Sequence, residues 1–225
     1  MMEDLAPKPM LVPKANYAYL IEWNEYYAPK ALYYLLNQDV FVKAAFKPFA
    51  AEVNGVRREF GFGTLVVSVT DQIVSADEVY AAVKEAQRIS GIDVYTVDTG
   101  KSAEGVYLGS NNVRTVEKPK VVMLVGDGVT YTEAGALWHL FDSKLNMPIT
   151  KVNTSQVGRI DMSDYNSLIL VSGNYSSLGE ANVDKIKDWV RDGGTLILVR
   201  NAVAWAIRSK LVEEELIKSE NDSSN

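Results

Sequence analysis

The stretch Lys120–Phe141, KVVMLVGDGVTYTEAGALWHLF, decides how this chain is expected to fold. It opens with a nearly continuous apolar run, Val121–Val125, which is typical of a strand that is buried on both faces. The glycine turn Gly126–Gly128 follows. Thr130 and Glu133 then form the Thr-x-x-Glu pattern that caps a helix N-terminus. The stretch therefore predicts a strand, a tight turn and a capped helix, the repeating unit of parallel α/β sheets.

The composition excludes several kinds of site. At 225 residues, 47% of them hydrophobic, the chain can bury the core of one large domain or two small ones. The absence of cysteine excludes a disulfide, a thiolate nucleophile and a cysteine-ligated metal, and a single histidine, His139, excludes a multi-histidine zinc site. The net charge of -6 argues against a nucleic-acid partner. No run reaches the roughly 18 apolar residues of a membrane span.

The rest of the chain alternates strands with helices. Apolar runs predict strands over residues 17–23, 40–46, 64–69, 93–97, 149–153, 167–172 and 195–199. Helices are predicted after Pro29, after Ser75 with a second capping box at Glu78, and over residues 182–192 and 202–211. The segment 47–63 mixes aromatic and basic side chains and is interpreted as a surface loop, with partner docking as the alternative.

This order predicts four segments. Residues 1–15 form a proline-rich extended lead-in, residues 16–118 a first α/β half, residues 119–212 a second α/β half, and residues 213–225 a disordered acidic tail. Both halves have the order strand, helix, strand, strand, helix, strand. We therefore predict an internal duplication of two flavodoxin- or amidotransferase-like halves with parallel strands and flanking helices. Whether these halves share one sheet is left open.

Three turns of the second half are expected at one sheet edge, because the carboxyl ends of parallel strands lie together. The turn at Gly126–Gly128 can offer backbone N–H groups to an anion at the helix N-terminus, although its glycines also serve a tight turn alone. Ser172 lacks the G-x-S-x-G elbow of serine hydrolases, and no histidine is placed to activate it. The ligand-binding candidates from these turns and the helix between them are Gly126, Asp127, Gly128, Glu133, Ser172, Gly173, Asn174, Tyr175, Arg200 and Asn201.

Three stretches together resemble class I glutamine amidotransferase-like domains: Val121–Phe141, SGNYSSL at Ser172–Leu178, and KDWVRDGGTLILV at Lys187–Val199. In that family the nucleophilic cysteine occupies the elbow that follows the strand matching residues 196–199. This chain has Arg200 and Asn201 there instead. The resemblance therefore implies a non-catalytic member of the family.

A wider similarity covers roughly Asn16–Leu216 and is carried by AYLIEWNEYYAPKALYYLL, FGFGTLVVSV, VYTVDTG, PKVVMLVGDGVTYTEAGALWHLFD and IKDWVRDGGTLILV. These stretches resemble the region that follows the peptidase domain in large bacterial zinc carboxypeptidases of the carboxypeptidase A-like group. The peptidase domain of that family binds zinc through an H-x-x-E pair and a later histidine. This signature does not occur in the sequence, so the resemblance assigns the chain no catalytic residue, no metal ligand and no cofactor. Zinc is expected only in a peptidase domain.

The resemblance implies a non-catalytic accessory region that acts in assembly, positioning or substrate binding. Its expected partners are an attached or associated peptidase domain and a peptide or small-molecule ligand, and a homodimer is left open. The compartment would be extracellular or periplasmic if the parent peptidase is secreted. Two alternatives stay open: a cysteine-free hydrolase that uses Asp127, Glu133 or Ser172, and a small-ligand-binding module at the same sheet edge.

Overall fold

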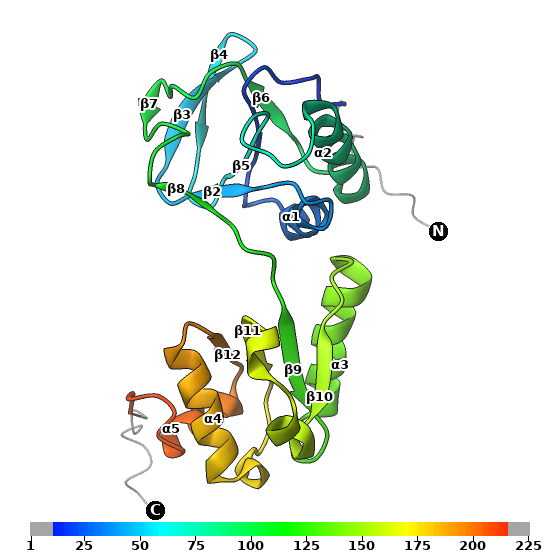
Figure 1. Cartoon of the computed structure of the whole chain (residues 1–225), viewed down its shortest axis with the longest axis vertical. Coiled ribbons are helices and arrows are strands. Elements are labelled where there is room, and N and C mark those ends of the chain that lie inside the picture. Colours follow the sequence, from blue (N-terminus) through cyan, green and yellow to red (C-terminus); the bar gives the residue numbers. More distant parts are fainter. Residues whose placement is uncertain (1–10, 216–225) are drawn as a thin grey trace, which may run out of the picture. The chain divides into compact units, whose positions relative to one another are not determined.

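The computed structural model describes residues 11–215, and these divide into two units (Figure 1). The first unit runs to Lys118 and includes Leu145–Met147. The second comprises Pro119–Lys144 and the residues from Pro148 onward. Most of the predicted lead-in and most of the predicted acidic tail lie outside the described residues. No helix within residues 11–215 is long and apolar enough to cross a membrane.

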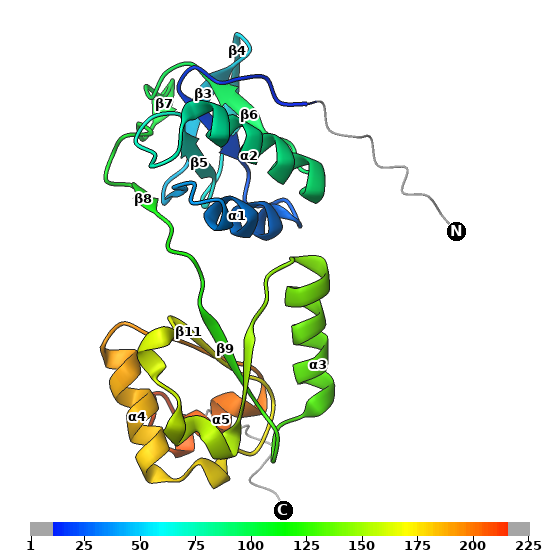
Figure 2. The same cartoon turned by 45° about the vertical axis from the view of Figure 1, so that its right-hand side comes forward.

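Within the described residues, the first unit consists of one layer of helices and two antiparallel sheets. The larger sheet has the strand order β6-β1-β5-β2-β8, formed by β1 (Ala18–Ile21), β2 (Lys43–Ala45), β5 (Leu65–Ser68), β6 (Tyr95–Val97) and β8 (Val113–Thr115). The smaller sheet has the order β4-β3-β7, formed by β3 (Phe49–Val53), β4 (Val56–Phe60) and β7 (Glu104–Gly105). The helices α1 (Ala28–Asn37) and α2 (Ala76–Ser90) lie side by side (Figure 2).

The larger sheet is covered on both faces. In β1, Tyr19 and Ile21 belong to the core cluster that contains the apolar residues of α1 and α2. Ala18 and Leu20 point to the other face, because successive side chains of a strand alternate, and they pack in the cluster that contains Phe49 of the smaller sheet. All four residues of β1 are consequently buried.

The prediction of parallel strands is wrong for this first half. Helix α1 connects β1 to β2, but β5 lies between these strands and pairs antiparallel with both. Helix α2 connects β5 to β6, and β1 lies between them in the same way. The two strand-helix-strand units are thus interleaved in the split βαβ, or ferredoxin-like, arrangement. The structure does not show the predicted duplication, since the second unit has a parallel sheet.

The interpretation of the segment 47–63 as a loop is also wrong. Residues 49–60 form the antiparallel hairpin of β3 and β4. Its turn is Asn54-Gly55, with φ of 51° and 77°, and two consecutive residues with positive φ are the signature of a tight hairpin turn. An Asn-Gly pair between two runs of five residues is the sequence signal that would have predicted this hairpin.

Helix α2 begins and ends as predicted. The Ser75 Oγ accepts a hydrogen bond from the Glu78 N–H at 3.3 Å, and the Glu78 carboxylate accepts one from the Ser75 N–H at 2.8 Å. Gly91 closes the helix in the left-handed conformation, with φ of 70°. The capping box predicted at Ser75 and Glu78 is therefore confirmed.

Ser75→Ala is expected to lower the free energy of unfolding of the first unit by about 1 kcal/mol, because it removes the acceptor for one N–H at the start of α2. Urea denaturation followed by far-ultraviolet circular dichroism measures this change. Ser75→Thr keeps a hydroxyl that can accept from the Glu78 N–H and donate to the Glu78 carboxylate, and it should stay near the wild-type midpoint. A loss of the same size in both variants would contradict the capping explanation.

In the part of the chain that is described, the second unit has one parallel sheet with the strand order β10-β9-β11-β12. Its strands are β9 (Val121–Val125), β10 (Thr150–Asn153), β11 (Ser167–Leu170) and β12 (Thr195–Leu198). Its helices are α3 (Tyr131–His139), α4 (Glu180–Arg191) and α5 (Asn201–Arg208). Short helical turns are η1 (Leu140–Lys144), η2 (Thr154–Arg159), η3 (Met162–Asp164) and η4 (Ser176–Leu178). The predicted parallel layer with flanking helices is confirmed for this half.

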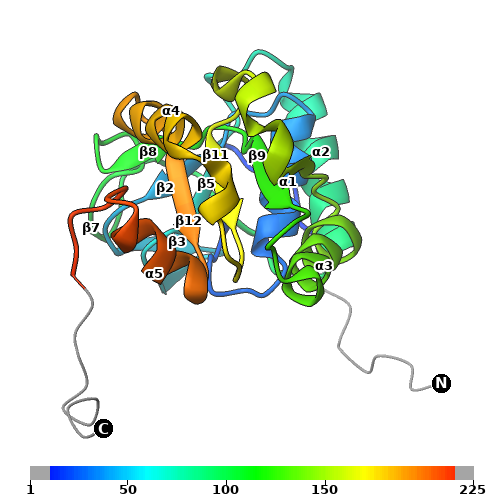
Figure 3. The same cartoon turned by 90° about the horizontal axis from the view of Figure 1, so that it is seen from below.

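Helices lie on both faces of the parallel sheet, although the α3 face is open at the edge strand β12, where Ile197 is 43% exposed. Val122 and Leu124 of β9 share a core cluster with residues of α4 and α5. Met123 points to the other face, where it lines a shallow pocket together with Ala134 of α3. Viewed from below, α4 and α3 flank β9, β11 and β12 on opposite sides (Figure 3). The strand order reverses between β9 and β11, and in doubly wound sheets ligands bind at the carboxyl end of such a reversal.

Candidate functional site

The turns that follow β9 and β11 are joined by backbone hydrogen bonds at the carboxyl edge of the sheet. The Thr130 N–H donates to the Ser172 carbonyl at 2.9 Å, and the Asn174 N–H donates to the Gly128 carbonyl at 2.8 Å. The structure thus brings together two of the three turns that the sequence placed at this edge. Their backbones form one continuous surface.

Two glycines permit this close approach. A Cβ atom on Gly128 would lie 2.2 Å from the Asn174 carbonyl oxygen, and one on Gly173 would lie 2.8 Å from the Gly128 carbonyl oxygen. Gly128 also has φ of 82°, a conformation that L-residues rarely adopt. Both glycines are therefore required by the backbone packing of the two turns, independently of any ligand.

Glu133 of α3 ties the third turn to the other two. Its Oε2 accepts a hydrogen bond from the Ser172 N–H at 3.0 Å, and its Oε1 lies 2.8 Å from Nη1 of Arg200. The predicted capping box with Thr130 does not form, since the Thr130 side chain makes no capping bond. The Ser172 amide and the Arg200 guanidinium occupy both carboxylate oxygens of Glu133, and the charged donor makes the stronger bond.

Arg200 occupies a strained backbone conformation between β12 and α5. Its φ of 53° and ψ of -116° belong to a region in which glycine is favoured. A sharp, strained strand-to-helix turn of this kind resembles the nucleophile elbow of α/β enzymes, which presents the reacting side chain at the top of the sheet. The turn at Arg200, called the elbow from here on, presents an arginine.

A cavity of about 720 Å³ opens beside these turns. One wall is a face of α5, formed at helical spacing by Asn201, Ala204, Trp205 and Arg208. The other wall comes from the two joined turns and η4, with lining residues Gly128, Thr130, Gly173, Asn174 and Ser176. Four of the predicted ligand-binding residues thus line this cavity: Gly128, Gly173, Asn174 and Asn201.

Trp205 and Arg208 of α5 are among the lining residues of this cavity that sequence reasoning missed. Asn201 had been singled out at the start of α5, and the residues four and seven positions later lie on the same helix face. The helical spacing from Asn201 is the signal that would have found them.

Tyr175, a predicted ligand-binding residue, lies in the core with 0% of its surface exposed. Its hydroxyl donates a hydrogen bond to the Val171 carbonyl at 2.7 Å, and its ring centroid lies 5.3 Å from that of Trp205. Burial raises the pKa of the Tyr175 hydroxyl far above its ordinary value. Tyr175 is therefore a core residue whose ring packs against Trp205.

The remaining predicted residues lie beside the cavity rather than in its wall. Gly126 faces the Asn153 side chain so closely that an added Cβ would lie 2.4 Å from the amide nitrogen. Asp127 is exposed at the tip of the turn. Ser172 is 6% exposed, and its hydroxyl has no hydrogen-bond partner within residues 11–215. Glu133 and Arg200 pair with each other as described above.

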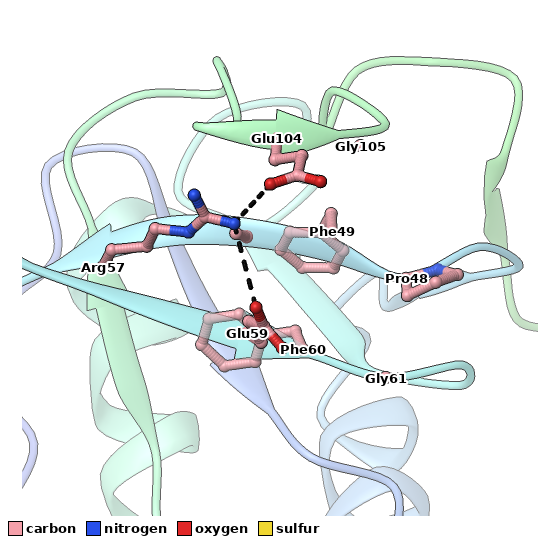
Figure 4. A pocket seen from close by; sticks show the side chains of 9 residues that line it. Pro48, Phe49, Arg57, Glu59, Phe60, Gly61, Glu104 and Gly105 are labelled. Carbon is pink, nitrogen blue, oxygen red and sulfur yellow. Dashed lines mark hydrogen bonds and ion pairs between the residues drawn. The ribbon is translucent and has the colours of Figure 1, made fainter.

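A second cavity, of about 320 Å³, lies in the first unit beside β3, β4 and β7 (Figure 4). Arg57 points toward Glu104 and forms an ion pair with it, and its guanidinium lies 3.8 Å from Glu59. Phe49 and Phe60 form a stacked pair below, with ring centroids 5.2 Å apart. The cation of this cavity is already neutralised by two carboxylates, so it offers less to a charged ligand than the cavity along α5.

Comparison with known proteins adds no relative to this description. No protein-family model, curated protein or solved structure matches the chain. Among the described residues, no group of three or more histidine, aspartate or glutamate side chains is arranged to hold a metal ion.

Proposed function

We propose that this chain is a non-catalytic accessory module that binds a ligand at the carboxyl edge of the second unit and serves an attached or associated zinc carboxypeptidase-like peptidase. The observation that supports it best is Arg200 at the strained elbow. A guanidinium is protonated at all physiological pH values and is not a nucleophile. The neighbouring Asn201 carries a neutral amide, which is not a nucleophile either.

The contacts of Ser172 and Glu133 do not favour the hydrolase alternative. Covalent catalysis by serine needs a base within hydrogen-bond reach of the hydroxyl. The Ser172 hydroxyl has no such partner among the described residues. The carboxylate of Glu133 accepts hydrogen bonds from the Ser172 backbone and from Arg200, so each of its oxygens already has a structural partner. This arrangement favours binding over chemistry.

The accessory role is supported by the similarity of the sequence to the region that follows the peptidase domain in zinc carboxypeptidases. The binding role is supported by the cavity along α5, whose volume is typical of small-molecule sites. The elbow holds the end of α5 against the joined turns through Arg200 and Glu133, and α5 provides one wall of the cavity. On this proposal the elbow serves to hold α5 in place and needs no nucleophile.

Two measurements test the proposal. The purified chain is expected to hydrolyse neither glutamine nor a C-terminal peptide bond above the buffer rate. Added to a carboxypeptidase domain encoded in the same reading frame or genomic neighbourhood, it is expected to co-elute with that domain in size-exclusion chromatography. Turnover that is abolished by Arg200→Ala or Asn201→Ala would contradict the absence of catalysis. Separate elution of the two proteins would contradict the accessory role.

A further inference from the structure

The cavity along α5 is lined by hydrogen-bond donors and by no acidic side chain. Its one charged residue is Arg208, at the end of α5. The Arg208 guanidinium forms no ion pair and no hydrogen bond within residues 11–215. It differs in this from Arg57 and Arg200, which are paired with carboxylates. A cation with five unused N–H donors thus faces the cavity.

Trp205 contributes a second donor that is fixed in place. The residue is only 6% exposed, and its ring packs against Tyr175. Its indole N–H has no partner within the described part of the chain. No fully buried polar side-chain atom there is without a partner, so the N–H is accessible at one of the two cavities that Trp205 lines, this one and the neighbouring one beside α4. An indole N–H donates and cannot accept, so it requires an acceptor on the ligand.

Asn174 presents its donor side to the ligand. Its Oδ1 accepts hydrogen bonds from the Ser176 N–H at 3.1 Å and from the Ser176 hydroxyl at 2.6 Å. The backbone N–H can only donate, so it identifies this atom as the oxygen and leaves the Asn174 NH₂ group for another partner. The amide of Asn201, on the first turn of α5, also has no partner among residues 11–215.

We propose that this cavity binds a small organic carboxylate, with the carboxylate group on Arg208 and the indole and amide N–H groups as further donors. The inference rests on the proposed binding function and names its ligand class. A guanidinium fork matches the two oxygens of a planar carboxylate. One unpaired cation balances a monoanion, whereas a phosphate dianion calls for further positive charge. The volume of about 720 Å³ leaves room for an organic portion against Trp205 and Ala204.

The test compares an acid with its neutral isostere. N-acetyl-L-alanine, N-acetyl-L-alanine amide and inorganic phosphate are titrated into the intact chain, with isothermal calorimetry and tryptophan fluorescence as readouts. The acid is expected to bind saturably, and the amide and phosphate each to bind at least about tenfold more weakly, because they lose the charge or the planar fit at Arg208. Arg208→Gln is expected to weaken binding of the acid by about tenfold or more.

Arg191→Gln is the matched control, because Arg191 is an exposed arginine on α4 that pairs with Asp188 and lies outside the cavity lining. It should leave binding unchanged. Arg208 is exposed, so its variant should keep the wild-type unfolding midpoint, and Asn201→Ala provides a second variant on the same wall. Equal binding of acid and amide, tighter binding of phosphate, no saturable binding of the acid, or full affinity in Arg208→Gln would each overturn the inference. None of these results bears on the absence of catalysis, which the turnover assay tests separately.

Discussion

Gly128→Ala is expected to lower the free energy of unfolding of the second unit by about 3 kcal/mol. The added Cβ would lie 2.2 Å from the Asn174 carbonyl oxygen, which is a backbone atom and cannot swing aside as a long side chain can. The alanine would also have to adopt φ of 82°, at a cost of about 1 kcal/mol. Relief requires the turns after β9 and β11 to separate, and this breaks the 2.8 Å hydrogen bond between Asn174 and Gly128.

Gly193→Ala is the matched control for this substitution. Gly193, which follows α4 in the same unit, has φ of 107°, but an added Cβ would meet no atom within 4 Å. It is therefore expected to cost only about 1 kcal/mol, from the backbone conformation alone. Urea denaturation followed by tryptophan fluorescence reports mainly on the second unit, which contains Trp138, Trp189 and Trp205. Equal losses of unfolding free energy in the two variants would show that the contact between the two turns does not contribute to stability.

Local sequence patterns predicted many elements of both units, although not the hairpin of β3 and β4, and they predicted the pairing of strands in only one unit. The apolar run Val121–Val125 forms β9 over the same five residues. In the first unit β1 is equally apolar, because helices cover one face of its sheet and a second sheet covers the other. A strand that is buried on both faces has the same pattern in parallel and antiparallel sheets. The insertion of β5 between β1 and β2 is a long-range event that this pattern does not encode.

The parts of the candidate site that directly follow strands could be predicted from the sequence. The turns at Gly128 and Asn174 follow neighbouring parallel strands, and they meet for that reason. The partners of Glu133 were not predictable, because a Thr-x-x-Glu pattern describes only the helix's own N-terminus. Arg200 lies 67 residues away in the chain and competes for the same carboxylate. The strain at Arg200 was equally hidden, since an arginine after a strand carries no signal of positive φ.

Substitutions at Arg200 can separate its strained backbone from its charge. Arg200→Ala removes the ion pair with Glu133 but keeps a Cβ in the unfavourable conformation. Arg200→Gly removes both. The Arg200 side chain is 74% exposed, so the lost ion pair accounts for at most about 1 kcal/mol, and it is lost equally in both variants. The glycine variant is expected to be more stable than the alanine variant by about 1.5 kcal/mol. Glycine relieves the backbone strain of the folded state, and part of this gain is offset because glycine also gives the unfolded chain more conformational freedom.

The same pair of substitutions at Arg191 gives the control. Arg191 is an exposed arginine at the end of α4, within the helix, and pairs with Asp188. Alanine is favoured over glycine in a helix by about 1 kcal/mol, so the order of stabilities should be reversed there. Urea denaturation of the four variants provides the measurement. If alanine proves as stable as glycine at position 200, the elbow is not strained. Opposite orders at the two arginines would show that the backbone at Arg200 is strained in the folded chain, as its positive φ implies.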